Sequence, residues 1–177
     1  FLHEMPNFKE FIEVTAKDMN GMNPSLVEKD YWIMHCLWGL KTQGLEFYMK
    51  GGTSLSKGFQ IIDRFSEDID IMIVPPAHLN VKAGKNHTKD AHIESRAKFY
   101  DYLKDEIKIP GLTGVERDKE FDDEKMRNGG LRLNYESHFG PVKGLKEGIL
   151  LEVGFDKINP NESLKISSWL VDKTIKL

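Results

Sequence analysis

Two acidic residues stand one residue apart at the start of an apolar run, and this segment limits the possible folds most strongly. The sequence runs Asp68-Ile69-Asp70 and then stays apolar as far as Val74. Side chains alternate along a strand, so Asp68 and Asp70 should project from one face. Two carboxylates beside a buried strand repel each other and lose hydration, and a divalent cation removes both costs. Because Mg²⁺ prefers carboxylate oxygens, waters and phosphates, the pair predicts a metal site. The alternative is a solvated strand start with exposed aspartates.

A third acid is expected from a neighbouring strand. Glu152 is the one acid within the apolar segment 148–155, where an unpaired charge would be costly. We therefore predict that Glu152 completes the metal site. Asp156 is the second choice, because a residue at the end of a strand can simply be exposed to solvent. Glu67 should point away from the metal and support the structure around it.

A glycine-rich turn precedes the acidic pair. Gly51 and Gly52 permit positive φ angles and the close approach of a ligand to the backbone. The helix expected next presents free N–H groups where phosphate binds readily. The hydroxyls of Thr53 and Ser54 can cap that helix and donate to phosphate oxygens, and Lys57 can face the same side as Thr53. The spacing is not that of a Walker A loop, and an ordinary strand-to-helix turn with a good cap is the alternative.

Hydrophobic periodicity predicts the other elements. Helices are expected over 7–19, from 23 to 40, over 54–62 and over 90–108, strands over 45–49, 68–74, 112–116, 131–135 and 148–155, and an ambiguous strand-like segment over 164–175. Ser25 and Glu28 have the spacing of a capping box. This order predicts an α+β (mixed α/β) fold with a central mixed sheet flanked by helices and an N-terminal helical pair. We expect residues 1–44 to form a helical region packed on a core of residues 45–177.

Composition excludes several classes of protein. The net charge of −3 argues against a globally basic protein that coats nucleic acid, although it permits a local phosphate site. A single cysteine, Cys36, excludes an internal disulfide and suits a reducing, cytoplasmic compartment. No apolar stretch approaches the roughly 20 residues that span a bilayer, and no signal peptide is apparent. Because the chain begins with Phe1, we expect it to be a piece of a longer protein.

Several other side chains have competing interpretations. Cys36 and two tryptophans of the second helix are expected in the core, although a partner face would also explain the tryptophans. Three lysines of the polar segment 78–90 would suit contacts to the phosphates of an acceptor RNA, with a mobile solvated loop as the default. Three histidines there suggest zinc, but their spacing fits no standard site, so solvated residues are expected. The residues are Trp32 and Trp38, then Lys82, Lys85 and Lys89, and finally His78, His87 and His92.

Taken together, the glycine turn, the Asp-x-Asp strand and the later lone acid resemble the signature of the nucleotidyltransferase superfamily, whose minimal fold is polymerase-β-like. More closely, Gly51–Lys57 and Arg64–Asp70 resemble the AbiEii-type family, the nucleotidyltransferase toxins of type IV toxin–antitoxin and phage-abortive systems. The upstream run Glu28–Trp32 is similar to the early helix of that family. The resemblance is strong over residues 25–75 and weaker over 128–156.

The resemblance implies metal-dependent transfer of a nucleoside monophosphate from a nucleoside triphosphate (NTP) to an acceptor hydroxyl on RNA, tRNA or protein. Mg²⁺ or Mn²⁺ would be the cofactor, a cognate antitoxin would be a partner, and no membrane would be involved. The family usually has a later helical part, whose pattern is not found before Leu177. The residues carried over are Gly51, Gly52, Thr53 and Ser54 for the triphosphate, Lys57 for phosphate charge, Asp68, Asp70 and Glu152 for the metal, and Glu152 also for activating the acceptor.

Two other functions would use the same residues. A catalytically inactive nucleotide- or RNA-binding module would bind triphosphate without releasing pyrophosphate. A metal-dependent nuclease or phosphohydrolase would use the carboxylates with water as the attacking group. Product analysis separates them, because a transferase lengthens or modifies its acceptor whereas a nuclease cleaves nucleic acid.

Overall fold

The computed structural model describes residues 1–174, and the elements follow the expected order closely. The helices are α1 (Phe8–Asp18), α2 (Pro24–Thr42), α4 (Asp90–Glu106) and α5 (Trp169–Thr174). The strands are β1 (Glu46–Lys50), β2 (Ile69–Val74), β3 (Leu112–Asp118), β4 (Asn128–Tyr135) and β5 (Ile149–Gly154). Between β1 and β2 lie one helical turn, α3 (Gly51–Thr53), and a π-helical turn, η2 (Ser54–Gly58). Short 3₁₀ turns are η1 (Leu2–Glu4), η3 (Ala77–Leu79) and η4 (Lys119–Phe121).

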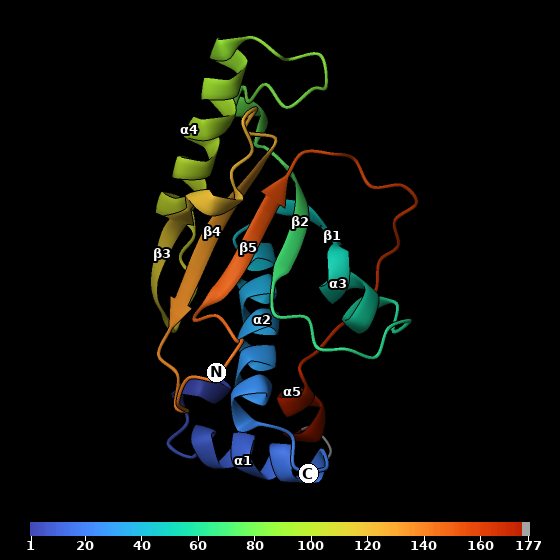
Figure 1. Cartoon of the computed structure of the whole chain (residues 1–177), viewed down its shortest axis with the longest axis vertical. Coiled ribbons are helices and arrows are strands. Elements are labelled where there is room, and N and C mark those ends of the chain that lie inside the picture. The colour runs from blue at the N-terminus through green and yellow to red at the C-terminus, as the bar shows by residue number, and fades with distance from the viewer. Residues whose placement is uncertain (175–177) are drawn as a thin grey trace.

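The strands form one mixed sheet, as predicted. Their order is β1-β2-β5-β4-β3, with β2 and β5 parallel and the other neighbours antiparallel. Parallel neighbours need a long crossover, and here residues 75–148, which include α4, β3 and β4, supply it. The α+β fold class with a central mixed sheet is therefore confirmed. Figure 1 shows α2 running behind the sheet, with α1 and α5 at one end of the molecule and the start of α4 at the other.

One face of the sheet packs against α2 and α4. Ile69 and Ile71 of β2 and Leu151 and Val153 of β5 are almost fully buried in this core. Tyr100 of α4 donates its hydroxyl to the carbonyl of Val153 at 3.3 Å. Because side chains alternate, the residues between them on β2 and β5 project from the opposite face. No helix in residues 1–174 has both the length and the apolar character to cross a membrane.

Three consecutive charged residues of α2 are buried and connect it to distant segments. Glu28 is fully buried and accepts hydrogen bonds from Ser137 Oγ at 2.6 Å and from the backbone N–H of His138 at 3.0 Å. Lys29 is also fully buried, and its ammonium lies 3.0 Å from Glu67 Oε2. Glu67 therefore points to α2, as expected for a structural acid. The capping box predicted at Ser25 is wrong, because Glu28 is used for these distant contacts and Asn23 caps the helix instead.

Asp30 completes this group and holds the C-terminal helix. Its carboxylate lies 2.6 Å from Lys57 Nζ and accepts the backbone N–H of Trp169 at 2.7 Å. Lys57 Nζ also lies 4.4 Å from the centroid of the Trp169 ring, within cation–π range. We call Glu28, Lys29 and Asp30 the buried charged triplet. Buried charges are tolerated only when they are paired and hydrogen-bonded, so the triplet fixes where these segments pack.

Three further expectations about local structure are wrong. The helix expected over 54–62 begins at Gly51 and ends at Gly58, because Thr53 is anchored to β2 and the wide turn η2 leaves Phe59 45% exposed. The strand-like segment 164–175 contains helix α5, whose start is held by Asp30; residue 175 lies outside the described range. Trp32 is in the core as predicted, and so is Cys36, but Trp38 is 44% exposed near the end of α2.

We predict that Asp30→Ala destabilises the fold severely. The substitution leaves a mostly buried Lys57 ammonium and a backbone N–H of Trp169 without their partner, which costs about 3–5 kcal/mol for a buried pair. Urea unfolding followed by circular dichroism measures the change. The matched control is Glu94→Ala, which removes an exposed ion pair with Lys98 on α4 and should cost about 0.5 kcal/mol or less. Equal losses in the two variants would contradict the role given to Asp30.

Candidate active site

One row of residues crosses the face of the sheet that is opposite the core. Lys50 of β1 pairs with Asp70 of β2, and Asp70 pairs with Glu152 of β5. The row continues to Gly130 of β4 and Asp118 of β3. Directly opposed residues in a sheet project from the same face about 5 Å apart. The structure therefore brings together Asp70 and Glu152, which lie 82 positions apart in the sequence.

The glycine turn closes over Asp70. Gly51 has a φ of +65°, and a Cβ atom built on it would overlap Asp70 Oδ2. A Cβ on Gly52 would lie 2.7 Å from Ser66 Oγ and 3.3 Å from a terminal nitrogen of Arg64. Glycine is thus required at position 51 for two reasons, the left-handed backbone and the contact with the carboxylate. The turn that was predicted to hold phosphate lies directly beside the predicted metal ligand.

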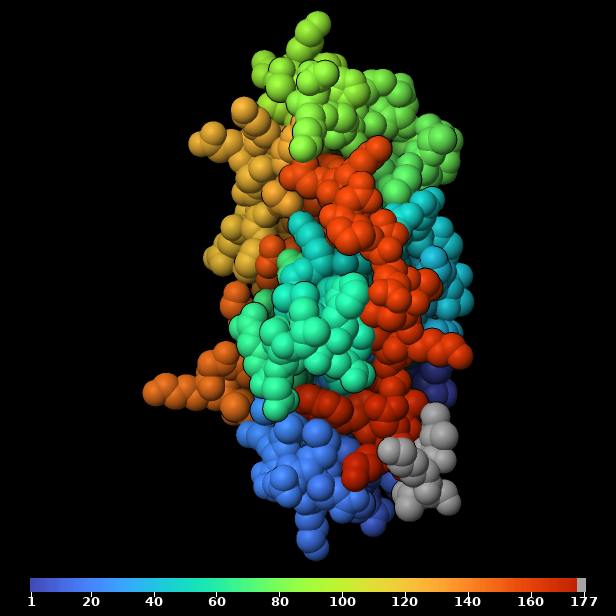
Figure 2. Space-filling model, turned by 90° about the vertical axis from the view of Figure 1, so that its right-hand side faces the viewer, coloured from blue at the N-terminus to red at the C-terminus, as the bar shows by residue number. Residues whose placement is uncertain are grey.

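Thr53 joins the turn to the acidic strand. It is buried, and its hydroxyl donates to the backbone carbonyl of Asp68 at 2.5 Å. This use was not foreseen, because the Thr53 hydroxyl was expected to cap the helix and to donate to phosphate. Ser54 is partly exposed beside it, so of the two hydroxyls it is the better placed for a ligand. Figure 2 shows the segment that follows β1 in the middle of one face, with the orange-red chain that follows β5 beside it.

The carboxylate of Asp68 lies in the same region and lacks a partner. Its Oδ1 atom is buried and has no hydrogen-bond partner within residues 1–174. Burial raises the pKa of Asp68, and the charge of Glu67 raises it further, while Lys29, Lys146 and Arg132 oppose the shift. A buried carboxylate oxygen without a donor is costly. Such an atom is a candidate to bind a cation.

The other two carboxyls are shifted in the same direction. Burial raises the pKa of Asp70, and Lys50 opposes the shift. Burial also raises the pKa of Glu152, and the charges of Asp70 and Asp68 raise it further, against Lys50 and Lys146. Groups whose pKa values are raised by burial and by like charges mark functional sites more often than structural ones.

These three acids fit a magnesium site that is completed by substrate. In the described residues no three His, Cys, Asp or Glu side chains converge closely enough to hold a metal ion by themselves. Mg²⁺ is usually bound by one or two carboxylates, waters and substrate phosphates, not by a cage made of protein alone. The unpartnered Oδ1 of Asp68 and the opposed pair Asp70 and Glu152 match this donor set. Asp156, the second choice for the third acid, is exposed after β5.

The cations around the site differ from those expected. Lys57, predicted to neutralise phosphate charge, is committed to Asp30 and Trp169 on α2 and α5. The ammonium of Lys50 instead lies on the site face, 3.2 Å from where a Cβ of Gly154 would be. Sequence reasoning missed Lys50. Lys50 could have been identified from the sequence by its position as the last strand residue before Gly51.

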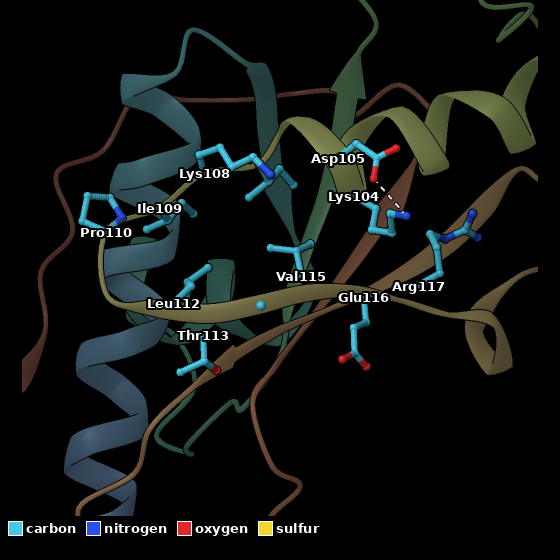
Figure 3. Close-up of a pocket in the computed structure, with 12 residues that line it drawn as sticks. Lys104, Asp105, Lys108, Ile109, Pro110, Leu112, Thr113, Val115, Glu116 and Arg117 are labelled. Carbon is cyan, nitrogen blue, oxygen red and sulfur yellow. Dashed lines mark ion pairs between the residues drawn. The ribbon is translucent and has the colours of Figure 1, made fainter.

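Two hollows in the surface do not contain the three carboxylates. One of about 900 Å³ lies between the C-terminal end of α4 and the edge strand β3, and Figure 3 shows charged side chains of both signs around it. None of the predicted site residues lines it. A second, of about 250 Å³, lies behind the glycine turn and includes Thr53, Lys57, Arg64 and Ser66 among its walls. The three carboxylates line neither hollow and are half-buried on the sheet face beside the glycine turn.

The polar segment before α4 is held by two arginines, the buried Arg96 and the partly exposed Arg127. Arg96 is fully buried and donates to the carbonyls of Lys82 and His87, at 2.6 and 3.1 Å. Arg127 donates to the carbonyls of Ala83 and Gly84, at 2.9 and 2.8 Å. These bonds fix the backbone while leaving the lysines of the segment outside. The histidines there form no metal-binding group of three within the described residues.

Comparison with protein families agrees with this geometry. The family described as "Nucleotidyl transferase AbiEii toxin, Type IV TA system" matches residues 32–176, which include the glycine turn and all three carboxylates. No match was found among curated proteins or among solved structures. The matched region makes up well over half of the chain. The chain therefore belongs to the AbiEii family of nucleotidyl transferase toxins of type IV toxin–antitoxin systems.

Proposed function

We propose that this nucleotidyltransferase moves a nucleoside monophosphate from an NTP to an acceptor hydroxyl with the help of Mg²⁺ or Mn²⁺. The observation that carries the proposal is the pairing of Asp70 with Glu152 directly beside Gly51, with an unpartnered Asp68 oxygen nearby. No single element of this arrangement would be sufficient. The combination of closely spaced, half-buried acids and a glycine turn supports a site for a cation and a phosphate group.

In the proposed reaction the acceptor oxygen attacks the α-phosphorus, an O–P bond forms, and pyrophosphate leaves. Asp68, Asp70 and Glu152 would hold the metal, which when bound supplies positive charge to the phosphate oxygens. The triphosphate would be positioned by the backbone of Gly51 and Gly52 and by the hydroxyl of Ser54. A raised pKa suits Glu152 to take the proton of the acceptor hydroxyl.

The acceptor is proposed to be RNA, tRNA or protein, in a reducing, cytoplasmic compartment and with an antitoxin that opposes the activity. Membership of a type IV toxin–antitoxin family supports the antitoxin partner. Incubation with each labelled NTP, Mg²⁺ and total RNA or protein should transfer label to one class of acceptor. Bound NTP without pyrophosphate release would identify an inactive binding module, and cleaved RNA would identify a nuclease.

We predict that Asp70→Asn and Glu152→Gln reduce transfer by about a hundredfold or more, because the phosphate charge loses several kcal/mol of stabilisation in the transition state. Label transfer measures the loss. The same variants should be more stable than the wild type by about 1 kcal/mol near neutral pH, since each removes a charge that burial disfavours. Transfer at the wild-type rate in Asp70→Asn would exclude the proposed site.

The stability gain should depend on pH. The folded pKa of each carboxyl lies above its ordinary value, so the wild type loses stability from these groups as pH rises through the folded pKa. Near pH 4 both folded and unfolded carboxyls are protonated in part, and the cost shrinks. The difference between Asp70→Asn and the wild type in urea unfolding should therefore fall from about pH 7.5 to about pH 4.5. A difference that grows toward acid would mean that the pKa of Asp70 is lowered.

We predict that Gly51→Ala removes activity more than its effect on stability explains. The new Cβ would displace the Asp70 carboxylate in addition to straining a backbone with φ +65°. Gly21→Ala is the matched control, because Gly21 has φ +75° and a Cβ there would meet nothing within 4 Å. Both variants should lose about 1 kcal/mol of stability from the left-handed backbone. Label transfer should be lost only in Gly51→Ala, and equal activity in the two would separate the turn from the reaction.

A further inference from the structure

We propose that Lys50 is the cation that draws the triphosphate into the site, and that without nucleotide its positive charge repels a divalent metal ion from Asp70 and Glu152. This inference rests on the proposed function. The inference goes beyond the proposed function because it gives one residue two opposite effects on binding: one on the metal ion alone and one on the triphosphate.

The first argument is the position of the Lys50 side chain. Lys50 is the last residue of β1 and stands in register with Asp70, which stands in register with Glu152. Its Nζ atom lies 3.2 Å from where a Cβ of Gly154 would be, on β5. Neighbouring strands are about 4.8 Å apart, so the side chain extends across β2 to reach that point. Because Gly154 has no side chain, it leaves room for the ammonium beside Glu152.

The second argument is that this ammonium is available. Within the part of the chain that the structure describes, Lys50 Nζ forms no ion pair and no side-chain hydrogen bond, although Asp70 and Glu152 follow it in the row. The ammonium of Lys57, in contrast, lies 2.6 Å from Asp30 and stacks on Trp169. A cation held in a buried pair cannot turn to a ligand without leaving its partner unpaired. A cation without such a partner on the site face can turn to a ligand.

The third argument is the sign of the charges. Lys50 stands in one row with Asp70 and Glu152, and its ammonium lies beside β5, so its positive charge acts on both carboxylates. A bare divalent cation that binds these acids is repelled by Lys50. A metal–triphosphate complex carries net negative charge and is attracted by it. Removal of the ammonium should therefore strengthen binding of the bare metal ion and weaken binding of the metal–triphosphate complex.

The test is isothermal titration calorimetry near pH 8 with two probes, Mn²⁺ alone and Mg²⁺-tripolyphosphate. Lys50→Met should bind Mn²⁺ about threefold more tightly and tripolyphosphate about tenfold more weakly than the wild type. Lys50→Arg keeps the charge and should restore tripolyphosphate binding to near the wild-type affinity. Lys17→Met, which removes an exposed charge from α1, is the matched control and should change neither affinity. Circular dichroism checks that each variant is folded.

The outcomes separate this inference from the proposed function. Changes in the same direction for both probes, or no change, in a folded Lys50→Met protein would overturn the role of Lys50 and leave the metal and phosphate site intact. If the wild type binds neither probe, the proposed function fails and the inference fails with it. Lys50→Gln provides a second neutral variant, so that a misfolded Lys50→Met protein does not leave the proposal without a result.

Discussion

The buried charged triplet of α2 is the constraint on which the rest of the structure depends. Glu28, Lys29 and Asp30 follow one another on a helix, so their side chains leave the axis in three directions about 100° apart. Each direction meets a different segment: 137–138, the acidic segment at Glu67, and η2 together with α5. An unpaired charge at any of these sites would cost several kcal/mol. The helix therefore selects one arrangement of the segments that surround the proposed active site.

In this arrangement, favourable packing and paired charges elsewhere offset the free-energy cost of the buried carboxylates of the site. The face of the sheet carries Asp70 next to Glu152, with Asp68 nearby. Burial raises the pKa of all three carboxyls, and the charges of the two aspartates raise that of Glu152 further. Such a cluster lowers the stability of the fold at neutral pH. The apolar packing of the opposite face against α2 and α4, together with the paired charges of the triplet, offsets that cost. The order of the strands matters here, because only the parallel pairing of β2 with β5 places these two acids side by side.

The lysines of the turn illustrate how tertiary contacts assign roles to similar residues. Lys50 and Lys57 stand at the two ends of the same short segment, and sequence spacing favoured Lys57 as the phosphate cation. The wide turn η2 sends Lys57 to the mostly buried Asp30, where it holds α2 and α5 together. Lys50, at the end of a strand, stays in the row of the acids.

The sequence alone determined the elements whose pattern is local. Alternation over 68–74, the apolar segment around Glu152 and the helices of the N-terminal region were predicted because burial imposes a period on each of them. The sequence also singled out Asp68, Asp70 and Glu152, since isolated acids in apolar strands need a compensating charge. Only the tertiary structure decided that α5 is a helix, that Thr53 bonds to the Asp68 carbonyl, and that Lys50 faces the site instead of Lys57. Those outcomes depend on partners more than 10 residues away, such as Asp30 for Trp169, and no local pattern records which distant charge a side chain will meet.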